Sequence, residues 1–359
     1  YLWCCLLRLD YSTIGTRFIV GLQGPILTEE ERDALRLLRP AGIIIFRNNI
    51  EKDNPDWMTT LRTLIQDARN ATGRQELIVS IDHEGGLVHR LPEPITKFPQ
   101  AMYWATLAHD VGRAMGQELR DLGFNLTFAP VLDIDLEPKN KVIGKRAFAR
   151  EPERVIEPAI MFMEGISNAG ILSCGKHFPG HGATTEDSHE VLPFLNLTLD
   201  ELRNRELIPF QALANAGIPM LMTSHVLCPL IDPENPTSLS RTLITDVLRG
   251  ELGYGGVVIT DAIEMKALGY FAIEEVVVKA LEAGNDLICF GQYDKCSPVL
   301  KALEVAQVLA DEVFDTYELN RSQRRLESLG ELILELDAIP PIPPDYVANS
   351  RLARTIPGQ

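Results

Sequence analysis

Eight short runs rich in Val, Ile and Leu alternate with longer helical stretches along most of the chain. The runs occupy residues 17–24, 42–46, 76–82, 126–135, 170–178, 219–225, 255–261 and 286–290. Several of them are apolar over their whole length, as expected for parallel strands that are covered on both faces. Eight strands in this alternation predict an α/β fold, a single (β/α)8 TIM-type barrel, with an open doubly wound sheet as the alternative.

Helix start and stop signals lie between these runs. Thr28 precedes three glutamates, which is the pattern of a capping box, and predicts a helix over 27–38. A second helix is predicted after Pro55, with its end at Gly73. Two more are predicted over 198–217 and 240–253, because each opens with Thr or Ser and stops at a glycine.

Charge and cysteine content limit the partners and the compartment. The net charge of −16 argues against nucleic acid and anionic membrane surfaces as partners, because the chain offers no basic field. The six cysteines form no C-x-x-C pair, which predicts a reducing compartment without disulfides. The apolar run at the N-terminus is too short to span a bilayer and lacks the features of a signal peptide. We therefore expect a cytoplasmic protein.

The chain contains no low-complexity linker that would divide it into separate units. We expect residues 1–15 to form an N-terminal extension and residues 16–337 to form one catalytic barrel with C-terminal helices. Residues 338–359 begin near "PPIPP" and are predicted to be a tail that leaves the domain.

Ionisable side chains gather where the predicted strands end. In a barrel, the loops that follow the strands form the active site, so these side chains are expected to converge there. They include Asp82 after the third run, Lys176 and His177 after the fifth, His225 after the sixth and Asp261 after the seventh.

The stretch "CGKHFPGHGATTEDSH" (174–189) admits more than one interpretation. His177, His181 and His189 could bind zinc together with an acid, although the H-x-x-x-H spacing falls in a Pro-Gly loop and not on a helix. Asp187 lies two residues before His189, and a carboxylate beside an imidazole can hold its tautomer and raise its pKa. For Asp261, the alternative interpretation is a helix N-cap.

The motifs taken together resemble glycoside hydrolase family 3. "GIIIFRNNIE", "IDHEGGLVHRLP", "FNLTFAPVLDID", "VIGKRAFA", "KHFPGHG", "DSHEVLP", "MLMTSHV" and "GVVITDAIEM" occur in the order of that family, between about residues 16 and 290. The similarity is greatest to its single-domain branch, the bacterial β-N-acetylglucosaminidases of cell-wall recycling.

The resemblance implies a role for each matching residue. Asp261 matches the nucleophile that forms a covalent glycosyl-enzyme, His189 matches an unusual acid/base, and Asp187 matches its dyad partner. The histidine thus replaces the second carboxylic acid of an ordinary retaining glycosidase. Residues that match the binding site of the terminal sugar are Asp82, Arg90, Arg146, Lys176 and His177.

The resemblance also implies a substrate. We expect a monomeric enzyme without metal or cofactor that removes GlcNAc from muropeptides or other β-GlcNAc glycosides. A phosphorylase on the same site is one alternative, and a zinc-dependent barrel hydrolase is another. Only about 70 residues follow the eighth run, which leaves no room for the second domain that supplies a glutamate acid/base in the family's β-glucosidases.

The chain departs from the common family motifs at four positions. His83, Leu87 and His89 stand where Gln, Arg and Gln are usual, and Ala147 stands where Ser is usual. None of the four is a predicted catalytic residue, so the departures concern substrate detail and not the class of reaction.

Overall fold

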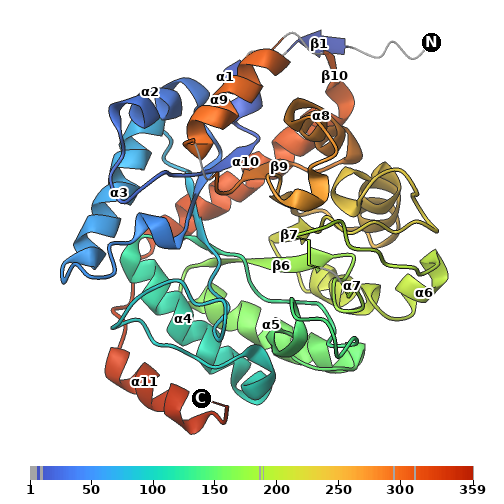
Figure 1. The fold of residues 1–359 in the computed structure, drawn as a ribbon. Helices are drawn as coiled ribbons and strands as arrows, with labels where there is room; N and C mark the ends of the chain where they lie inside the picture. Colours follow the sequence, from blue (N-terminus) through green and yellow to red (C-terminus); the bar gives the residue numbers. More distant parts are fainter. Residues whose placement is uncertain are drawn as a thin grey trace.

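Eight parallel strands close into a barrel, which confirms the predicted (β/α)8 fold over the open sheet (Figure 1). This computed structural model describes residues 6–8, 11–185, 187–188, 190–293, 296–310 and 313–358. The last strand pairs with the first, so the barrel has no free edge. Its strands are β2 (Phe18–Gly21), β3 (Gly42–Ile45), β4 (Ile78–Ile81), β5 (Leu126–Thr127), β6 (Leu172–Phe178), β7 (Met220–Thr223), β8 (Val257–Ala262) and β9 (Leu287–Phe290).

Helices form a ring around the strands (Figure 1). The α-helices are α1 (Tyr11–Gly15), α2 (Glu29–Leu38), α3 (Trp57–Thr72), α4 (Ala108–Leu122), α5 (Pro152–Asn168), α6 (Leu199–Arg203), α7 (Leu207–Asn215), α8 (Ile273–Ala283), α9 (Pro298–Leu309), α10 (Thr316–Ala338) and α11 (Tyr346–Thr355). Short helical turns follow several strands: η1 (Arg47–Asn49), η2 (Ala101–Tyr103), η3 (Ala105–Leu107), η4 (Gly144–Arg146), η5 (Thr237–Leu239) and η7 (Lys266–Leu268). A π-helix, η6 (Thr242–Glu251), lies between β7 and β8.

Apolar side chains fill two regions, one inside the barrel and one between the strands and the helices. Ile19, Leu126 and Met220 belong to the interior group, which also contains Leu329 and Ile333 of α10. Helix α10 therefore lies across the N-terminal end of the barrel and closes it. The opposite end, where the loops after the strands lie, is the end at which barrel enzymes bind their substrates.

The predicted helix signals are confirmed in part. Thr28 caps α2 in a complete capping box with Glu31, and Gly73 ends α3 in a left-handed conformation. The single helix predicted over 198–217 is wrong, because the chain forms α6 and α7 with a break between them. Pro209 explains the break: its ring excludes the carbonyl of the fourth residue before it, so the helix must restart shortly before the proline. The stretch 240–253 does form a helix, but with π-type geometry.

The segment predicted as a C-terminal tail contains a helix that packs against the barrel. The Nδ2 amide of Asn349 in α11 donates to Glu118 of α4 at 2.9 Å, and the hydroxyl of Tyr346 donates to Asp121 at 3.3 Å. Ala353 of α11 is buried in the main core. Residues beyond "PPIPP" thus pack against the surface of α4. The predicted division of the chain into extension, barrel and tail remains a prediction.

Two further features lie outside the barrel. The short strand β1 (Leu6–Arg8) pairs antiparallel with β10 (Val313–Asp315), which joins the start of the described chain to the segment before α10. In the part of the chain that the structure describes, no helix has both the length and the apolar character needed to cross a membrane.

Candidate active site

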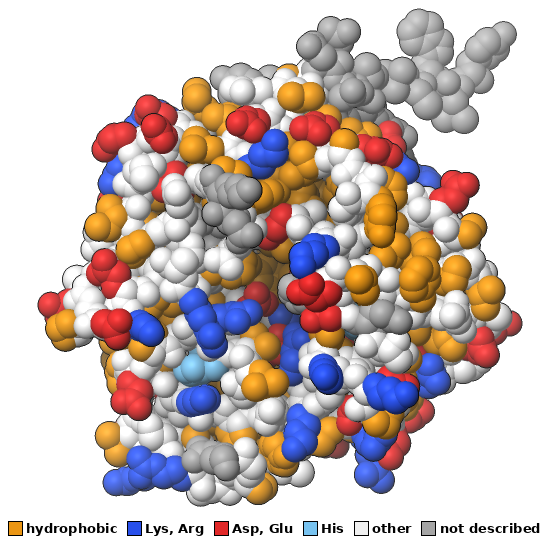
Figure 2. Space-filling view, viewed as in Figure 1, with side chains coloured by type: hydrophobic (Ala, Val, Ile, Leu, Met, Phe, Trp, Pro, Cys, Tyr) orange, Lys and Arg blue, Asp and Glu red, His pale blue; other side chains and the backbone are white. Residues whose placement is uncertain are grey.

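A cavity of about 520 Å³ opens at the C-terminal ends of the strands. Figure 2 shows a hollow near the middle of this face, with basic side chains beside it and acidic side chains within and around it. Six predicted site residues line this cavity: Asp82, Arg90, Arg146, Lys176, His177 and Asp261. Residues separated by up to 179 positions in the sequence thus meet in one place, as the barrel topology requires.

Strand alternation explains why these side chains point into the barrel. Cys174 belongs to the interior apolar group, and Lys176 lies two residues further along the same strand, so both face the same side. Asp261 is the fifth residue of β8, two positions after the interior residue Ile259. The interpretation of Asp261 as a helix N-cap is wrong, because Asp261 lies within a strand and α8 begins only at Ile273.

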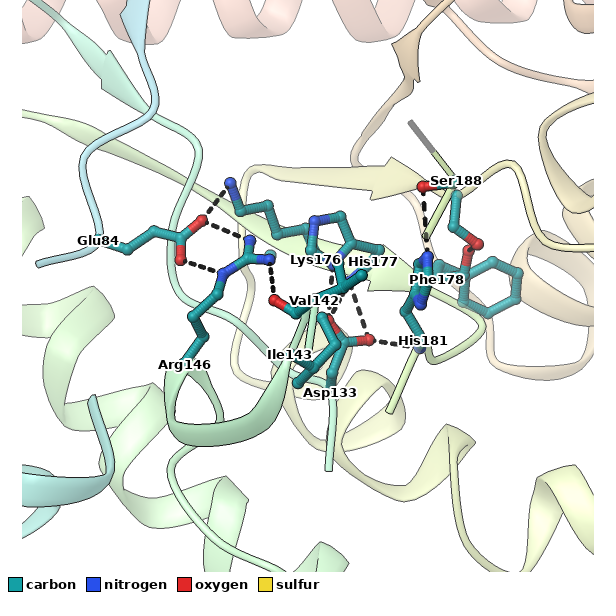
Figure 3. A network of polar contacts seen from close by, with 12 residues as sticks. Glu84, Asp133, Val142, Ile143, Arg146, Lys176, His177, Phe178, His181 and Ser188 are labelled. Carbon is teal, nitrogen blue, oxygen red and sulfur yellow. Dashed lines mark hydrogen bonds and ion pairs between the residues drawn. The ribbon is translucent and has the colours of Figure 1, made fainter. Parts of the chain in front are cut away.

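A network of two carboxylates and two cations lies on one side of the cavity: Asp82, Glu84, Arg146 and Lys176. Figure 3 shows its contacts among Glu84, Arg146 and Lys176. Arg146 contacts Glu84 with two nitrogens, at 2.8 and 2.9 Å. The Nζ of Lys176 lies 2.6 Å from Glu84 and 2.8 Å from Asp82. Burial alone would raise the pKa of Glu84, but the two cations outweigh it and hold this pKa far below its usual range. Burial would also lower the pKa of Lys176, and the two carboxylates raise it instead. Glu84, Arg146 and Lys176 are therefore charged at neutral pH.

Asp133 organises the loop that follows β6. Its carboxylate accepts from Nδ1 of His177 at 2.6 Å and from the backbone N–H of His181 at 2.7 Å (Figure 3). Burial would raise the pKa of Asp133, but His177 and His181 lower it on balance. Because Nδ1 of His177 faces Asp133, the Nε2 of this ring is directed away from it and is available to the cavity that His177 lines.

His181 is part of the same loop framework. Its ring contacts Thr184 at 2.7 Å and Ser188 at 3.3 Å, and burial together with His177 lowers its pKa. Gly182 follows, and a side chain there would collide with the carbonyl of Ile134. These contacts hold the start of the Gly-rich loop against the strand-end segment at Asp133.

The loop that carries the predicted acid/base dyad is described in part. The carbonyl of Asp187 accepts from the backbone of Glu190 and Val191, and Asp187 is partly exposed. The carbonyl of Ser188 accepts from the N–H of Ala267 at 3.3 Å, which ties this loop to the loop after β8, the strand that carries Asp261. His189, the predicted acid/base, lies outside the described residues.

The zinc interpretation also depends on His189. Among the residues that the structure describes, no three His, Cys, Asp or Glu side chains are arranged to hold a metal ion. His177 and His181 are instead hydrogen-bonded to Asp133 and to Thr184 and Ser188.

Arg90 reaches the cavity from a turn after β4. Gly85 and Gly86 both have positive φ, and side chains there would collide with Pro99 and Gln100, which explains the two glycines of "EGG". Arg90 lies 3.9 Å from Asp82. Leu87, one of the departures from the family motif, is exposed at the surface and does not line the cavity.

The rings of two histidines of this turn contact each other at an interplanar angle of 48°. The ring centroids of His83 and His89 are 4.7 Å apart. His83 is buried, and neither of its ring nitrogens has a hydrogen-bond partner among the described residues. Burial lowers the pKa of His83 well below its usual value and lowers that of His89 to about 4. The folded protein therefore keeps both rings neutral.

We predict that this pair makes the protein less stable in mild acid. Below about pH 6.5 the unfolded chain binds protons at both rings while the folded protein does not, so stability is lost as the pH falls from 6.5 towards 4. The double variant His83→Gln/His89→Gln is expected to remove this loss, on the order of 2 kcal/mol or more between pH 7.5 and pH 5. Urea unfolding at the two pH values measures it.

The control for this prediction is His109→Gln, which removes a surface imidazole of α4. It should show the same loss of stability in acid as the natural chain. If the double variant also loses as much stability between pH 7.5 and 5 as the natural chain does, the two buried rings do not cause the acid sensitivity.

Several residues of the cavity and its support are not among the predicted site residues. Glu84 and Asp133 carry the two polar networks, and Arg47 and Glu264 line the cavity. Glu84 and Asp133 lie at the ends of the third and fourth runs, so the strand-end criterion places both at this end of the barrel but assigns neither a role. Glu264 lies in the loop after β8, three residues after Asp261, where no pattern in the sequence distinguishes it from a surface glutamate.

Both the sequence and the fold are similar to those of known carbohydrate-processing enzymes. Residues 15–329 match the family model described as glycosyl hydrolase family 3 N terminal domain. A beta-hexosaminidase of Chromobacterium violaceum is 37% identical over 299 residues, which cover 79% of this chain and 81% of the relative.

Two solved structures are similar over nearly the whole chain. A glycoside hydrolase family 3 beta-N-acetylglucosaminidase from Paenibacillus sp. str. FPU-7 has a TM-score of 0.85 at 32% identity, covering 97% of this chain and 68% of that one. NagZ from Neisseria gonorrhoeae, solved in complex with N-trifluoroacetyl-D-glucosamine, has a TM-score of 0.76 at 30% identity, covering 94% of this chain and 97% of that one.

Proposed function

The chain belongs to glycosyl hydrolase family 3 and is a glycoside hydrolase of the β-N-acetylhexosaminidase class, and we propose that it acts as a retaining exo-β-N-acetylglucosaminidase through Asp261. The observation that carries this proposal is the convergence of Asp261 with Asp82, Lys176 and His177 in one cavity at the C-terminal ends of the strands. A carboxylate among polar groups that can bind a sugar, at that end of a barrel, is the arrangement that glycosyl transfer to an enzyme requires.

In the first step, an oxygen of Asp261 bonds to the anomeric carbon as the bond to the leaving oxygen breaks. His189, as imidazolium, donates a proton to that oxygen, and Asp187 stabilises the positive ring. In the second step, neutral His189 takes a proton from water, and the water oxygen displaces Asp261 from the anomeric carbon. Two inversions at the same carbon retain its configuration.

Support for the nucleophile comes from how Asp261 is held. Its Oδ1 accepts from the backbone N–H of Ala262 at 2.8 Å. The buried ring of His225 lies 3.0 Å from the carbonyl of Ala262 and 2.7 Å from the hydroxyl of Ser238. A carboxylate on a strand end that is braced in this way loses little entropy when it reaches the reacting geometry.

We propose that Asp82, Arg90, Lys176 and His177 bind the hydroxyls of the terminal sugar, with Arg146 orienting its neighbours. Lys176 and His177 are buried except toward the cavity, so the hydrogen bonds that they make to a sugar would be shielded from water. Arg146 already contacts Glu84 with two nitrogens, which supports an orienting role for it.

The dyad is supported by the way in which its loop is attached. Contacts of Ser188 with His181 and with the backbone of Ala267 bring the loop of Asp187 beside the loop of Asp261. A Gly-rich loop that carries the proton donor can close after the sugar binds and exclude water.

We propose GlcNAc-terminated muropeptides as the natural substrate, in the cytoplasm, with the protein acting as a monomer. The substrate follows from similarity to the single-domain branch of the family. The reducing compartment is supported by four cysteines that form no disulfide among the described residues, three of them buried. Burial raises the pKa of the thiols of Cys174, Cys228 and Cys289, which keeps them unreactive.

The test compares 4-nitrophenyl β-GlcNAc with 4-nitrophenyl β-glucoside, each with and without phosphate, and follows the product by NMR. We expect release of β-configured GlcNAc that does not depend on phosphate, and much slower cleavage of the glucoside. An α-configured first product would overturn the retaining mechanism. GlcNAc 1-phosphate as the main product would favour the phosphorylase alternative, in which phosphate replaces water in the second step.

A further inference from the structure

The wall of the candidate active site contains one more carboxylate, near Asp261, that belongs to neither polar network described above. Glu264 follows Asp261 by three residues and lines the same cavity. Among the described residues, no lysine, arginine or histidine lies within ion-pair distance of Glu264. Glu264 is half-buried. A half-buried carboxylate without a cation and beside another carboxylate costs folding free energy, and such groups are typical of functional sites.

The two oxygens of Glu264 bind the backbone of the loop after β9. One accepts from the N–H of Gly291 at 3.0 Å, and the other accepts from the N–H of Gln292 at 2.5 Å. Both donors come from consecutive residues directly after β9, so one carboxylate joins the loop after β8 to the loop after β9.

Gly291 is shaped to receive this carboxylate. A Cβ atom at position 291 would lie 2.2 Å from Oε1 of Glu264 and 3.1 Å from the Cβ of Ala262. Any other residue at position 291 would therefore displace the carboxylate of Glu264, or move the loop after β9 away from Ala262. Glu264 and Gly291 form one fitted contact.

The contact extends through Gln292 to two more loops. The Nε2 amide of Gln292 donates to Asn48 at 2.5 Å, and Asn48 in turn donates to the carbonyls of Leu22 and Gln23. The loops after β8, β9, β3 and β2 are thus linked across the seam where the barrel closes. Gln292 also lines the cavity, so the position of its side chain depends on this link.

We propose that Glu264 is a positioning residue for the glycosidase reaction: it holds the loop after β9 against the loop of Asp261 and so sets the wall of the site beside the nucleophile. The inference rests on the proposed function, because it concerns the same cavity and the same reaction. An ionised carboxylate has free acceptor sites for both backbone N–H groups, whereas a side chain with a single acceptor oxygen cannot bind both in this geometry.

The protonation state of Glu264 should therefore matter to the reaction. Burial raises its pKa to about 7, and the backbone N–H groups of Gln292 and Gly291 act in the opposite direction. The titratable or charged groups around it are Asp261 in β8, Cys289 in β9, Tyr293 after β9, and Lys266, which pairs with Glu190. As the pH falls through about 7, the carboxylate of Glu264 binds a proton and loses one of its acceptor sites. Its contact with the loop after β9 then weakens, and the wall of the site loosens.

The test is Glu264→Gln, measured as kcat and KM on 2,4-dinitrophenyl β-GlcNAc between pH 5.5 and 8. This leaving group needs little acid catalysis, so titration of the predicted acid contributes little to the first step. We expect kcat/KM to fall by about 10- to 100-fold at pH 8, because small displacements at a reacting centre have effects of this size. The natural chain should gain activity as the pH rises through about 7, and the variant should lack this rise.

Gly291→Ala attacks the same contact from the other side and should give the same kinetic change. The double variant should be no worse than the more impaired single variant, because both changes break one contact. The matched control is Glu275→Gln, which removes a surface carboxylate of α8 that pairs with Lys279, and it should leave kinetics unchanged.

Three outcomes separate the hypotheses. If Glu264→Gln and Gly291→Ala keep the natural kcat/KM and pH profile per folded molecule, Glu264 is only structural and the inference is wrong. If Glu264→Gln fails to fold, Gly291→Ala alone decides in the same way. If the natural chain cleaves no β-hexosaminide at all, the proposed function fails, which is distinct from a failure of the positioning role.

Discussion

Replacement of Asp261 by asparagine is expected to reduce hydrolysis of 4-nitrophenyl β-GlcNAc by at least about a thousandfold, because the glycosyl-enzyme can no longer form. Asparagine has nearly the same shape, and its carbonyl oxygen can still accept from the N–H of Ala262, as Oδ1 of Asp261 does now. The fold should therefore survive, and the melting temperature should change little. The measurement is kcat of the purified variant after its folded fraction has been checked.

Two further observations make this prediction specific. Asp261→Gly leaves space for an external nucleophile, so azide should restore cleavage of an activated aryl substrate and give the α-configured glycosyl azide. Asn substitution at Asp246, an acid on helix η6 that does not line the cavity, should leave activity unchanged. If Asp261→Asn retained most of the natural activity, another residue would be the nucleophile.

Replacement of Lys176 by methionine is expected to impair both stability and catalysis. Lys176 is almost completely buried, and its Nζ lies within 2.8 Å of both Asp82 and Glu84. Methionine fills a similar volume but carries no charge to balance the two carboxylates. Arg146 beside Glu84, and the more distant Arg90 beside Asp82, are then the remaining cations. Loss of one partner from a buried ion pair costs about 3–5 kcal/mol of unfolding free energy, which urea denaturation can measure.

The kinetic part of this prediction separates sugar binding from folding. If Lys176 also binds a substrate hydroxyl, kcat/KM per folded molecule should fall by about 100-fold, with a larger part of the effect on KM. Lys301→Met, which removes a lysine of α9 paired with Glu304 at the surface, should change stability by less than about 1 kcal/mol. An unfolding free energy of Lys176→Met equal to that of the natural chain would contradict the buried network.

The alternation of strands and helices could be predicted because its cause is local. Parallel strands in a barrel are covered on both faces, so each appears as a continuous apolar run, and all eight runs became strands. Thr28 and Gly73 were reliable helix limits because capping depends on a few neighbouring residues. The split near Pro209 also has a local cause, but the start and stop signals at 198 and 217 predict one helix, because they mark only its two limits.

The candidate site could be predicted only as a set of strand-end residues. A barrel brings the C-terminal ends of its strands together, so Asp82, Lys176 and Asp261 had to converge, whatever their separation in the chain. The network partners did not follow from this rule, because Arg146 and Glu84 contact each other through side chains from two different loops. The contact of Glu264 with Gly291 likewise depends on how two loops pack and not on any motif.

By itself, the sequence determined the fold class, the end of the barrel where chemistry occurs, and the residue types found there, because periodicity and strand ends are local properties. Only the tertiary structure decided which charges neutralise each other, which histidines are held neutral by burial, and that α10 and α11 pack back onto the barrel. Those outcomes depend on distances between segments far apart in the chain. Burial and pairing set the charge state of a side chain, and neither is determined until the whole core has packed.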